Sequence, residues 1–179
     1  MSHSDGDLSY FNDAVSGIAC RHNALVKYAS DVGLRVSVRA LSNKLQHLKR
    51  TGYVRYQHND VVFIMDVGEI GPTFQPGHGH ADILSFELSV ADQRLFVNSG
   101  VSEYSVVSGL RLEERSTRSH NTVTINEMNS SEVWSAFRVA RRASPFDLCV
   151  VETEDTCYIE CSHDGYRRLP GHPVHTRQV

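Results

Sequence analysis

The sequence predicts a mainly β protein, an antiparallel β-sandwich preceded by a short α-helical segment. Its 179 residues, 40% hydrophobic and 22% charged, are enough for one well-buried domain. Up to about residue 48, apolar residues recur with the period of a helix, and after Thr51-Gly52 they alternate with the period of a strand. Short strands with turns between them are typical of an antiparallel sandwich.

Residues 7–48 are expected to be helical. Asn12 or Asp13 can cap a short first helix, and Asn23 can cap a second one that ends before Gly33, where glycine is common after a helix C-terminus. The apolar positions expected to face a core are Ala14, Val15, Ile18 and Ala19, then Leu25, Tyr28, Ala29 and Val32, then Leu41, Leu45 and Leu48 in a further turn or two.

Strands are expected from residue 53 onward. The predicted strands are 53–57, 61–65, 84–90, 94–98, 121–125, 136–142, 146–152 and 157–162. Polar residues at 58–60 and 91–93 predict tight turns between neighbouring strands. In 84–90, Leu84, Phe86 and Leu88 share one face, and Ser85 and Glu87 lie on the other, which is the pattern of a half-buried strand.

Composition argues against several functional classes. The net charge of −3 gives no reason to expect nucleic-acid binding, and no apolar run approaches the roughly 18 residues of a membrane span. The polar, acidic residues 1–7 do not form a signal peptide. The four cysteines form no zinc-type pair; Cys149 and Cys157 flank a predicted turn and can pair there, although free buried thiols are the favoured reading.

Three polar segments follow one another along the chain. Residues 78–82 read His-Gly-His-Ala-Asp before a Leu-Ser-Phe strand, residues 97–100 read Val-Asn-Ser-Gly, and residues 115–122 read Arg-Ser-Thr-Arg-Ser-His-Asn-Thr. This order resembles the carboxy-terminal domain of the heparinase II/III family of polysaccharide lyases, over roughly residues 50–170 with a weaker echo near Tyr10 to Ala14. Three ordered motifs are far more specific than His-x-His alone, which matches by accident.

The resemblance implies a division of the chain. Residues 1–48 would be the end of a truncated α/α toroid, and residues 49–179 a heparinase II/III-like β-sandwich that is itself truncated at its C-terminus. The family's catalytic tyrosine would then lie upstream of residue 1. We therefore expect exposed apolar surface on the fragment and no lyase activity from these 179 residues alone.

The resemblance also assigns site residues. His78 falls on the family's catalytic histidine and Tyr104 on an auxiliary active-site tyrosine, unless Tyr104 is only a half-buried loop aromatic. His80, Asn98 and His120 fall on the ligands of one divalent metal ion, most naturally zinc; no organic cofactor is implied. The family usually has Asp where this chain has Asn98, and an amide oxygen is a weaker ligand. The alternative is a hydrogen-bonded cluster that braces the loops.

Strand geometry sets a condition on this site. A hairpin turning near Asp92 pairs Leu88 with Phe96, which leaves Asn98 opposite Phe86 and roughly 20 Å from His80 along the strand. The two can share a site only if residues 78–82 fold back over the sheet. Gly77 and Gly79, which flank His78, make such a fold-back sterically easy.

Arginines supply the candidates for binding an anionic sugar, because guanidinium matches carboxylate and sulfate in a bidentate manner. Arg111 and Arg118 are candidate substrate-binding residues, and Arg115, at the head of the third motif, is a candidate catalytic residue. Glu113 and Glu114 interleave with them, so a self-neutralised loop is an equal alternative. The other arginines of this part of the chain, Arg138, Arg141 and Arg142, are expected on the outer face of a strand instead.

The function implied is β-elimination on a uronate-containing acidic polysaccharide, in bacterial surface-polysaccharide metabolism and in the cell envelope or periplasm. The alternative is a non-catalytic carbohydrate-binding or structural β-sandwich. A cupin-type oxygenase is a distant third, because Glu87 comes seven residues after His80 and on the opposite strand face. The sequence does not indicate which sugar is used or what the oligomeric state is.

Overall fold

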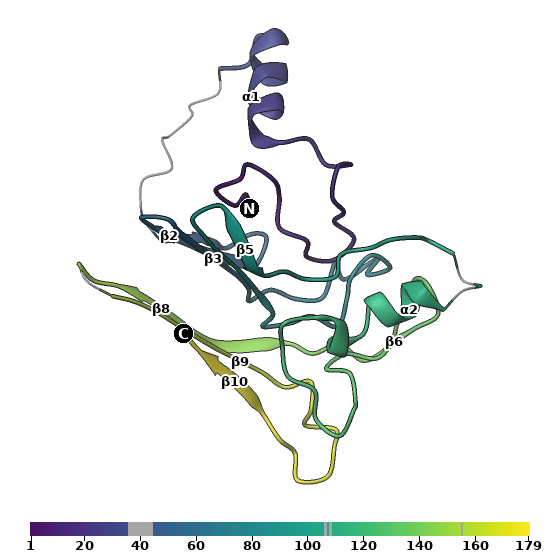
Figure 1. Ribbon diagram of the computed structural model, residues 1–179. Helices are drawn as coiled ribbons and strands as arrows, with labels where there is room; N and C mark the ends of the chain where they lie inside the picture. Colours follow the sequence, from purple (N-terminus) through teal and green to yellow (C-terminus); the bar gives the residue numbers. More distant parts are fainter. Residues whose placement is uncertain (36–44, 106, 108, 155) are drawn as a thin grey trace.

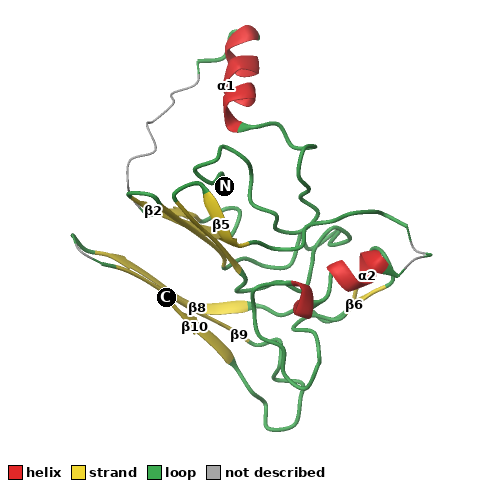
Figure 2. Cartoon of the chain, viewed as in Figure 1, coloured by secondary structure: helices red, strands yellow, loops and turns green. Residues whose placement is uncertain are grey.

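The computed structural model describes residues 1–35, 45–105, 107, 109–154 and 156–179. Strands dominate and every pairing among the described strands is antiparallel, which confirms the mainly β class (Figure 2). A five-stranded sheet has the order β1 (Gln46–Leu48), β2 (Tyr53–His58), β3 (Val61–Asp66), β4 (Phe86–Val90), β5 (Gln93–Phe96). A second sheet has the order β10 (His175–Gln178), β9 (Cys157–His163), β8 (Pro145–Glu152), and β6 (Val133–Trp134) pairs with β7 (Arg138–Val139).

One hydrophobic core joins the two larger sheets, which lie one beneath the other in Figure 1. Phe63 and Met65 of β3 point into it from the first sheet, and Ile159 and Cys161 of β9 from the second. Alternate residues of a strand face opposite sides of its sheet, so the remaining side chains of β3 face away from this core. The predicted apolar face of β4 does pack here, through Phe86 and Leu88.

The other face of the five-stranded sheet is also buried. Residues 1–14 run across it, and Phe11 packs against Val62 and Ile64. The expectation of a half-buried strand at 84–90 is therefore wrong, because Glu87 and Ser89 are buried beneath this segment. Glu87 is fully buried and satisfied by the segment that covers it.

Glu87 anchors the N-terminal segment to β4. Its Oε1 accepts the backbone N–H groups of Tyr10 (2.6 Å) and Asn98 (3.2 Å), and its Oε2 lies 2.8 Å from His3 Nε2. His3 Nδ1 lies 2.8 Å from the hydroxyl of Ser89. A buried carboxylate is tolerated because these partners replace the hydration that it loses.

The helical expectations hold only in part. The predicted helix over residues 12–19 is wrong: these residues form turns, and Asn12 has a positive φ of 52°. Helix α1 (His22–Asp31) exists, with Gly33 in the left-handed conformation (φ 79°) just after its C-cap. No residue of α1 is buried, so its apolar stripe does not face a core among the described residues. Leu48 lies in strand β1 rather than a helix, and Leu41 falls outside the described residues.

Two predicted strands are also wrong. Residues 121–125 form no strand, because the side chain of Asn121 ties them to the sheet by donating to the carbonyls of Phe86 and Val97. Of the predicted strand 136–142, only the two residues of β7 (Arg138–Val139) are a strand, and they pair with β6 (Val133–Trp134) in a short hairpin. Two helical turns, α2 (Leu110–Glu114) and η1 (Thr117–Ser119), lie beyond the first 48 residues, where we expected no helix.

The β4–β5 hairpin confirms the predicted register. Leu88 pairs with Phe96, and the turn places Ala91 (φ 47°) and Asp92 (φ 63°) in the left-handed region, as tight hairpins require. In the β8–β9 hairpin, Cys149 pairs with Glu160 and Cys157 with Glu152, so the two thiols do not lie opposite each other. None of the helices in the described part of the chain has the length and apolar character that crossing a bilayer requires.

Replacing the buried anchor should loosen the N-terminal segment. Removing one partner of a buried ionic network costs about 3–5 kcal/mol, so we expect Glu87→Ala to lower Tm by about 10 °C. Glu87→Gln, which keeps one acceptor oxygen, should lose less. Calorimetry measures the effect, and Glu113→Ala, at a surface position, is the matched control. An unchanged Tm for Glu87→Ala would mean that the segment is held by its apolar contacts alone.

Candidate functional site

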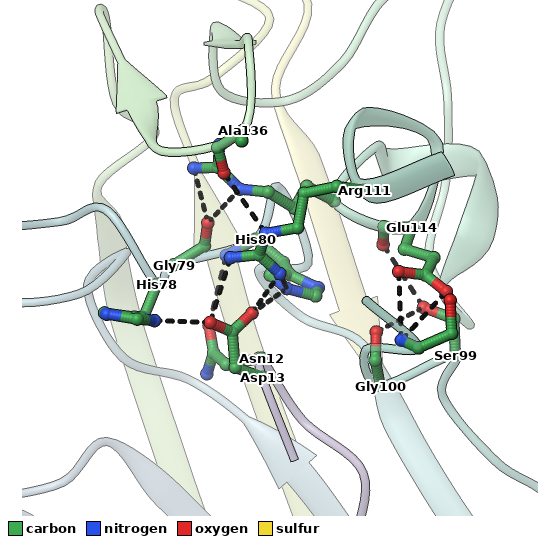
Figure 3. A network of polar contacts seen from close by, with 12 residues as sticks. Asn12, Asp13, His78, Gly79, His80, Ser99, Gly100, Arg111, Glu114 and Ala136 are labelled. Carbon is green, nitrogen blue, oxygen red and sulfur yellow. Dashed lines mark hydrogen bonds and ion pairs between the residues drawn. The ribbon is translucent and has the colours of Figure 1, made fainter. Parts of the chain in front are cut away.

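A network of polar side chains converges on Asp13 (Figure 3). Its carboxylate accepts hydrogen bonds from His78 Nδ1 (2.5 Å), from His80 Nε2 (2.8 Å) and from both Nη1 and Nη2 of Arg111, the latter at 2.9 Å. These partners come from sequence positions at least 65 residues away. Asp13 is therefore the residue that joins the N-terminal segment to the two polar motifs.

Asp13 stays anionic in this setting. Burial alone would raise the pKa of its carboxyl, but the bonds with His80, Arg111 and His78 outweigh burial and hold that pKa well below its ordinary value. A carboxylate that accepts from His78 Nδ1 keeps the proton on that nitrogen and leaves a lone pair on Nε2. The His78 side chain is 63% exposed, so this lone pair is available to a substrate.

Residues 78–82 fold back over the sheet, as the shared site requires. The N–H of Ala81 donates to the carbonyl of Arg115 (2.9 Å), and Leu84 has a positive φ of 59° where the chain turns into β4. Gly79 allows this path, since a Cβ there would lie 2.9 Å from a side-chain carbon of Ile70. The fold-back overcomes the separation that a straight strand would impose.

His80 and His120 come together, as predicted. Nδ1 of His80 lies 3.3 Å from Nε2 of His120, and the ring centroids are 5.2 Å apart although the residues are 40 positions apart. Asn98 joins this cluster, but its Oδ1 lies 3.2 Å from Nδ1 of His120, on the ring edge that faces away from His80. The structure thus places two of the three predicted ligands edge to edge and the third behind one of them.

The proton positions in this cluster follow from its partners. His80 Nε2–H donates a hydrogen bond to Asp13. Asn98 Oδ1 accepts hydrogen bonds from the backbone N–H of Asn121 (3.4 Å) and from Nδ1–H of His120. The two inner nitrogens face each other 3.3 Å apart, so either a proton on His80 Nδ1 donated to His120 Nε2 or a cation between them satisfies both. Burial, with the charge of His80, lowers the pKa of His120 to about 3 and disfavours a proton there.

Two buried carboxyl groups are coupled electrostatically to this cluster: Asp82 interacts with His80, and Asp66 interacts with Asp82. Burial, with the charge of Asp82, raises the pKa of Asp66 well above its ordinary value. Burial raises the pKa of Asp82 to about 6, against the opposing charge of His80. Like charges in a dry interior cannot both ionise easily, so each of these carboxyl groups disfavours ionisation of the other.

The predicted arginines lie mostly inside the protein. Arg111 and Arg115 are fully buried. Arg111 Nε donates to the carbonyl of Ala136 (3.2 Å), and Arg115 donates to the carbonyls of Gly79 (2.9 Å) and Ala136 (2.9 Å). Burial, with the charge of Arg111, lowers the pKa of Arg115 to about 10. In this structure both side chains brace backbone around the site, and their roles towards a substrate stay predictions.

Arg118 and Tyr104 are exposed. Arg118 pairs with Glu113 and lines a separate pocket of about 490 Å³ together with Glu127 and Asn129. Tyr104 is 53% exposed and packs edge-on against His78, with ring centroids 6.0 Å apart. Of the two, Tyr104 lies beside the candidate catalytic histidine.

Sequence reasoning missed two residues. Asp13 was interpreted as a helix cap, although the faint family echo at Tyr10 to Ala14 pointed to this segment. Phe137, in the β6–β7 hairpin, lies 5.7 Å from the ring of His78 and was not singled out at all. Its neighbour Gly77 leaves room for the hairpin, because a Cβ there would lie 3.2 Å from the Phe137 carbonyl oxygen.

Comparisons with known proteins agree with this geometry. The family described as "Heparinase II/III-like, C-terminal" matches residues 40–179. The chain belongs to the heparinase II/III-like C-terminal domain family. Comparison with curated protein sequences gives no match.

Solved structures share the fold. A crystal structure of heparinase III is 20% identical with a TM-score of 0.67, covering 100% of this chain and 29% of that chain. The heparinase III BT4657 gene product is 17% identical with a TM-score of 0.70, covering 99% and 28%. A mutant of the heparan sulfate lyase HepC from Pedobacter heparinus is 21% identical with a TM-score of 0.60, covering 88% and 23%. The chain thus spans less than a third of the length of these proteins.

Loss of the shared carboxylate should disturb both histidines and Arg111. Asp13→Ala leaves a buried guanidinium without its counter-ion, and we expect a loss of about 3 kcal/mol in the free energy of unfolding. The ¹⁵N shifts of the His78 ring should change from an Nδ1-protonated form to a mixture of tautomers. Denaturant titration and NMR measure the two effects.

Asp7→Ala is the matched control for this experiment, because Asp7 pairs with Arg21 at the surface. A His78 ring that keeps its tautomer in Asp13→Ala would contradict the role assigned to Asp13.

Proposed function

We propose that this chain is the sandwich part of a polysaccharide lyase that cleaves a uronate-containing acidic polysaccharide by β-elimination. The observation that carries the proposal is the Asp13–His78 pair, with a buried anionic carboxylate behind an exposed imidazole. Membership of the heparinase II/III-like family supports the reaction class, and one of the similar structures is that of a heparan sulfate lyase.

β-Elimination requires a base for the acidic proton at C5 of the uronate. His78 Nε2 carries the free lone pair, and Asp13 holds the ring in that tautomer and stabilises the imidazolium that forms when the proton is taken. The arrangement is that of an oriented general base. Histidine suits this work because its ordinary pKa lies close to neutrality.

The departing glycosidic oxygen requires an acid. Burial, with the charge of Asp13, raises the pKa of Tyr104, so its hydroxyl is protonated at neutral pH. Its ring lies next to His78, which puts a proton donor and the base on the same side of the site. We assign Tyr104 the auxiliary acid role.

We further propose one divalent metal ion, zinc, held by His80 Nδ1 and His120 Nε2. Two zinc–nitrogen bonds of about 2.0–2.1 Å at a tetrahedral angle separate the nitrogens by roughly 3.3–3.4 Å, and the observed separation is 3.3 Å. The facing lone pairs also favour a cation. When bound, the ion would supply a fixed positive charge that supports the loops. Within the described residues no group of three or more His, Cys, Asp or Glu is arranged to hold a metal, so the fit rests on two protein ligands.

Asn98 favours one alternative, a non-catalytic carbohydrate-binding or structural domain. An amide behind His120 donates no negative charge to the cluster, and it raises the basicity of the ring less than a carboxylate would. Metal content and product formation separate the two functions. Location in the cell envelope or periplasm is part of the same proposal and rests on the family resemblance.

His78 should be required for cleavage. In the intact natural protein, His78→Ala should lower the rate of unsaturated-uronate formation by about 10²–10⁴-fold, the usual cost of losing a general base. Ultraviolet absorbance of the new double bond, with heparan sulfate and alginate as polymers, measures it. His22→Ala, on exposed helix α1, is the control.

The 179-residue chain assayed alone should give no product, because it spans less than a third of the heparinases that it matches. Cleavage unaffected by His78→Ala would rule out the assignment of the base.

Metal binding should depend on the two imidazoles and respond to position 98. We expect one zinc per chain, lost in His80→Ala and in His120→Ala. Asn98→Asp should bind zinc about 10–100-fold more tightly, since carboxylate partners of ligating histidines carry effects of that size. Calorimetric titration of the metal-stripped chain measures affinity, with His172→Gln as control. Zinc uptake that survives loss of both His80 and His120 would refute the site.

A further inference from the structure

A groove of about 320 Å³ lies beside His78. One wall is the loop of residues 74–78, and the other is the β6–β7 hairpin, through Phe137, Arg138 and Val139. This volume is at the lower end of the range for small-molecule sites, about 300–1,000 Å³. Because His78 lines the groove, a ligand that fills it lies next to the exposed Nε2.

Buried arginine side chains hold the hairpin that forms one wall of the groove. Two fully buried arginines, Arg111 and Arg115, both donate to the carbonyl of Ala136, which precedes Phe137. Arg111 also lies between two rings, with its guanidinium 5.0 Å from the centroids of Tyr104 and Phe137. Sites on braced backbone hold their side chains in a fixed geometry, which a binding surface needs.

Phe137 offers an apolar surface next to the candidate base. Its side chain is 41% exposed, and its ring packs against those of His78 and Tyr104, each with a centroid separation of 5.7 Å. The face of an aromatic ring carries partial negative charge and attracts the polarised C–H groups of a pyranose face. Without a ligand, the exposed part of the Phe137 ring is in contact with water, which is unfavourable for an apolar side chain.

Arg138 lines this groove, and unlike the arginines near it, its positive charge is free to pair with a ligand. Arg111 is paired with Asp13, Arg115 with carbonyls, and Arg142 donates to the carbonyls of Pro72 and Thr73. Arg138 is exposed, and in the described part of the chain no carboxylate lies within salt-bridge distance of it. Its guanidinium lies over the ring of Trp134, 5.7 Å from the centroid, which limits its freedom without neutralising it.

We propose that Phe137 and Arg138 form a subsite for an anionic pyranose. The sugar ring stacks on Phe137, and its carboxylate or sulfate pairs with Arg138 in the bidentate manner that guanidinium favours. The subsite lies beside the sugar on which His78 acts and so rests on the proposed lyase function for its biological role. It moves anion recognition from Arg111 and Arg118, the arginines singled out by sequence, to Arg138.

Binding tests the subsite independently of cleavage. The 179-residue chain is titrated by calorimetry with a heparan sulfate hexasaccharide, a mannuronate hexamer and neutral cellohexaose. We expect both anionic sugars to bind. Arg138→Ala should weaken them about five- to tenfold, the effect of losing one partly exposed charge-assisted pair. Phe137→Ala should weaken them about fivefold, and Phe137→Tyr less than twofold.

Arg141→Ala is the matched control, because Arg141 is exposed on the same segment and pairs with Glu132; its affinity should stay within twofold of the wild type. Unchanged circular dichroism and Tm confirm that the variants fold. The subsite is overturned if neither anionic sugar binds at millimolar concentration. It is also overturned if the Arg138→Ala and Arg141→Ala variants bind these sugars with equal affinity.

The lyase and the subsite fail in distinguishable ways. Arg138-dependent binding without any His78-dependent cleavage in the intact protein overturns the lyase function and supports the subsite. His78-dependent cleavage with binding that ignores both Phe137 and Arg138 overturns the subsite alone.

Discussion

One carboxylate, that of Asp13, holds the polar centre of this protein together. It neutralises the buried guanidinium of Arg111 and accepts hydrogen bonds from both His78 and His80. A buried arginine without a counter-ion costs several kcal/mol, so the α2 turn that carries Arg111 depends on this contact. The same charge selects the tautomers of both histidines. Stability and candidate chemistry therefore rest on one side chain.

The position of Asp13 depends in turn on the N-terminal segment. Residues 1–14 cover a sheet face that contains Glu87, and Glu87 accepts the backbone N–H of Tyr10. The Asn12 side chain then accepts the N–H of His80 (3.1 Å), which aligns the two chains just before Asp13 meets the histidines. An extended segment suits this task, since it can present backbone donors to a buried carboxylate where a helix would use them internally. The candidate site thus depends on the sheet face that binds the N-terminal segment. The sequence pattern had indicated that this strand is only half-buried.

Local patterns in the sequence predict the strands well and the long-range contacts poorly. The β2–β3 and β4–β5 hairpins follow from alternation and turn residues, which act over a few positions. The approach of His80 to His120 was predicted from the order of three motifs and the glycines around His78. The role of Asp13 was not predicted, because its partners lie at least 65 residues away in the sequence. In addition, an Asp before a small apolar run is a good helix cap, which is how this residue was interpreted. The apolar stripe of α1 was wrongly expected to face a core for a related reason. The periodicity of apolar residues indicates a helix, but it does not indicate what packs against that helix.

The arginines show why a charge in the sequence does not fix the partners of a side chain, and the reason is physical. A guanidinium carries five donors and a long apolar stem, so it can bind solvent anions or brace backbone carbonyls inside the protein equally well. Sequence shows the charge but not the carbonyls, so Arg111 and Arg115 pointed to substrate although their donors are satisfied by Asp13, Gly79 and Ala136. Buried charge of this kind fixes the hairpin that carries Phe137 and Arg138. Two internal cations thereby set the geometry of the hairpin that carries a third, exposed one.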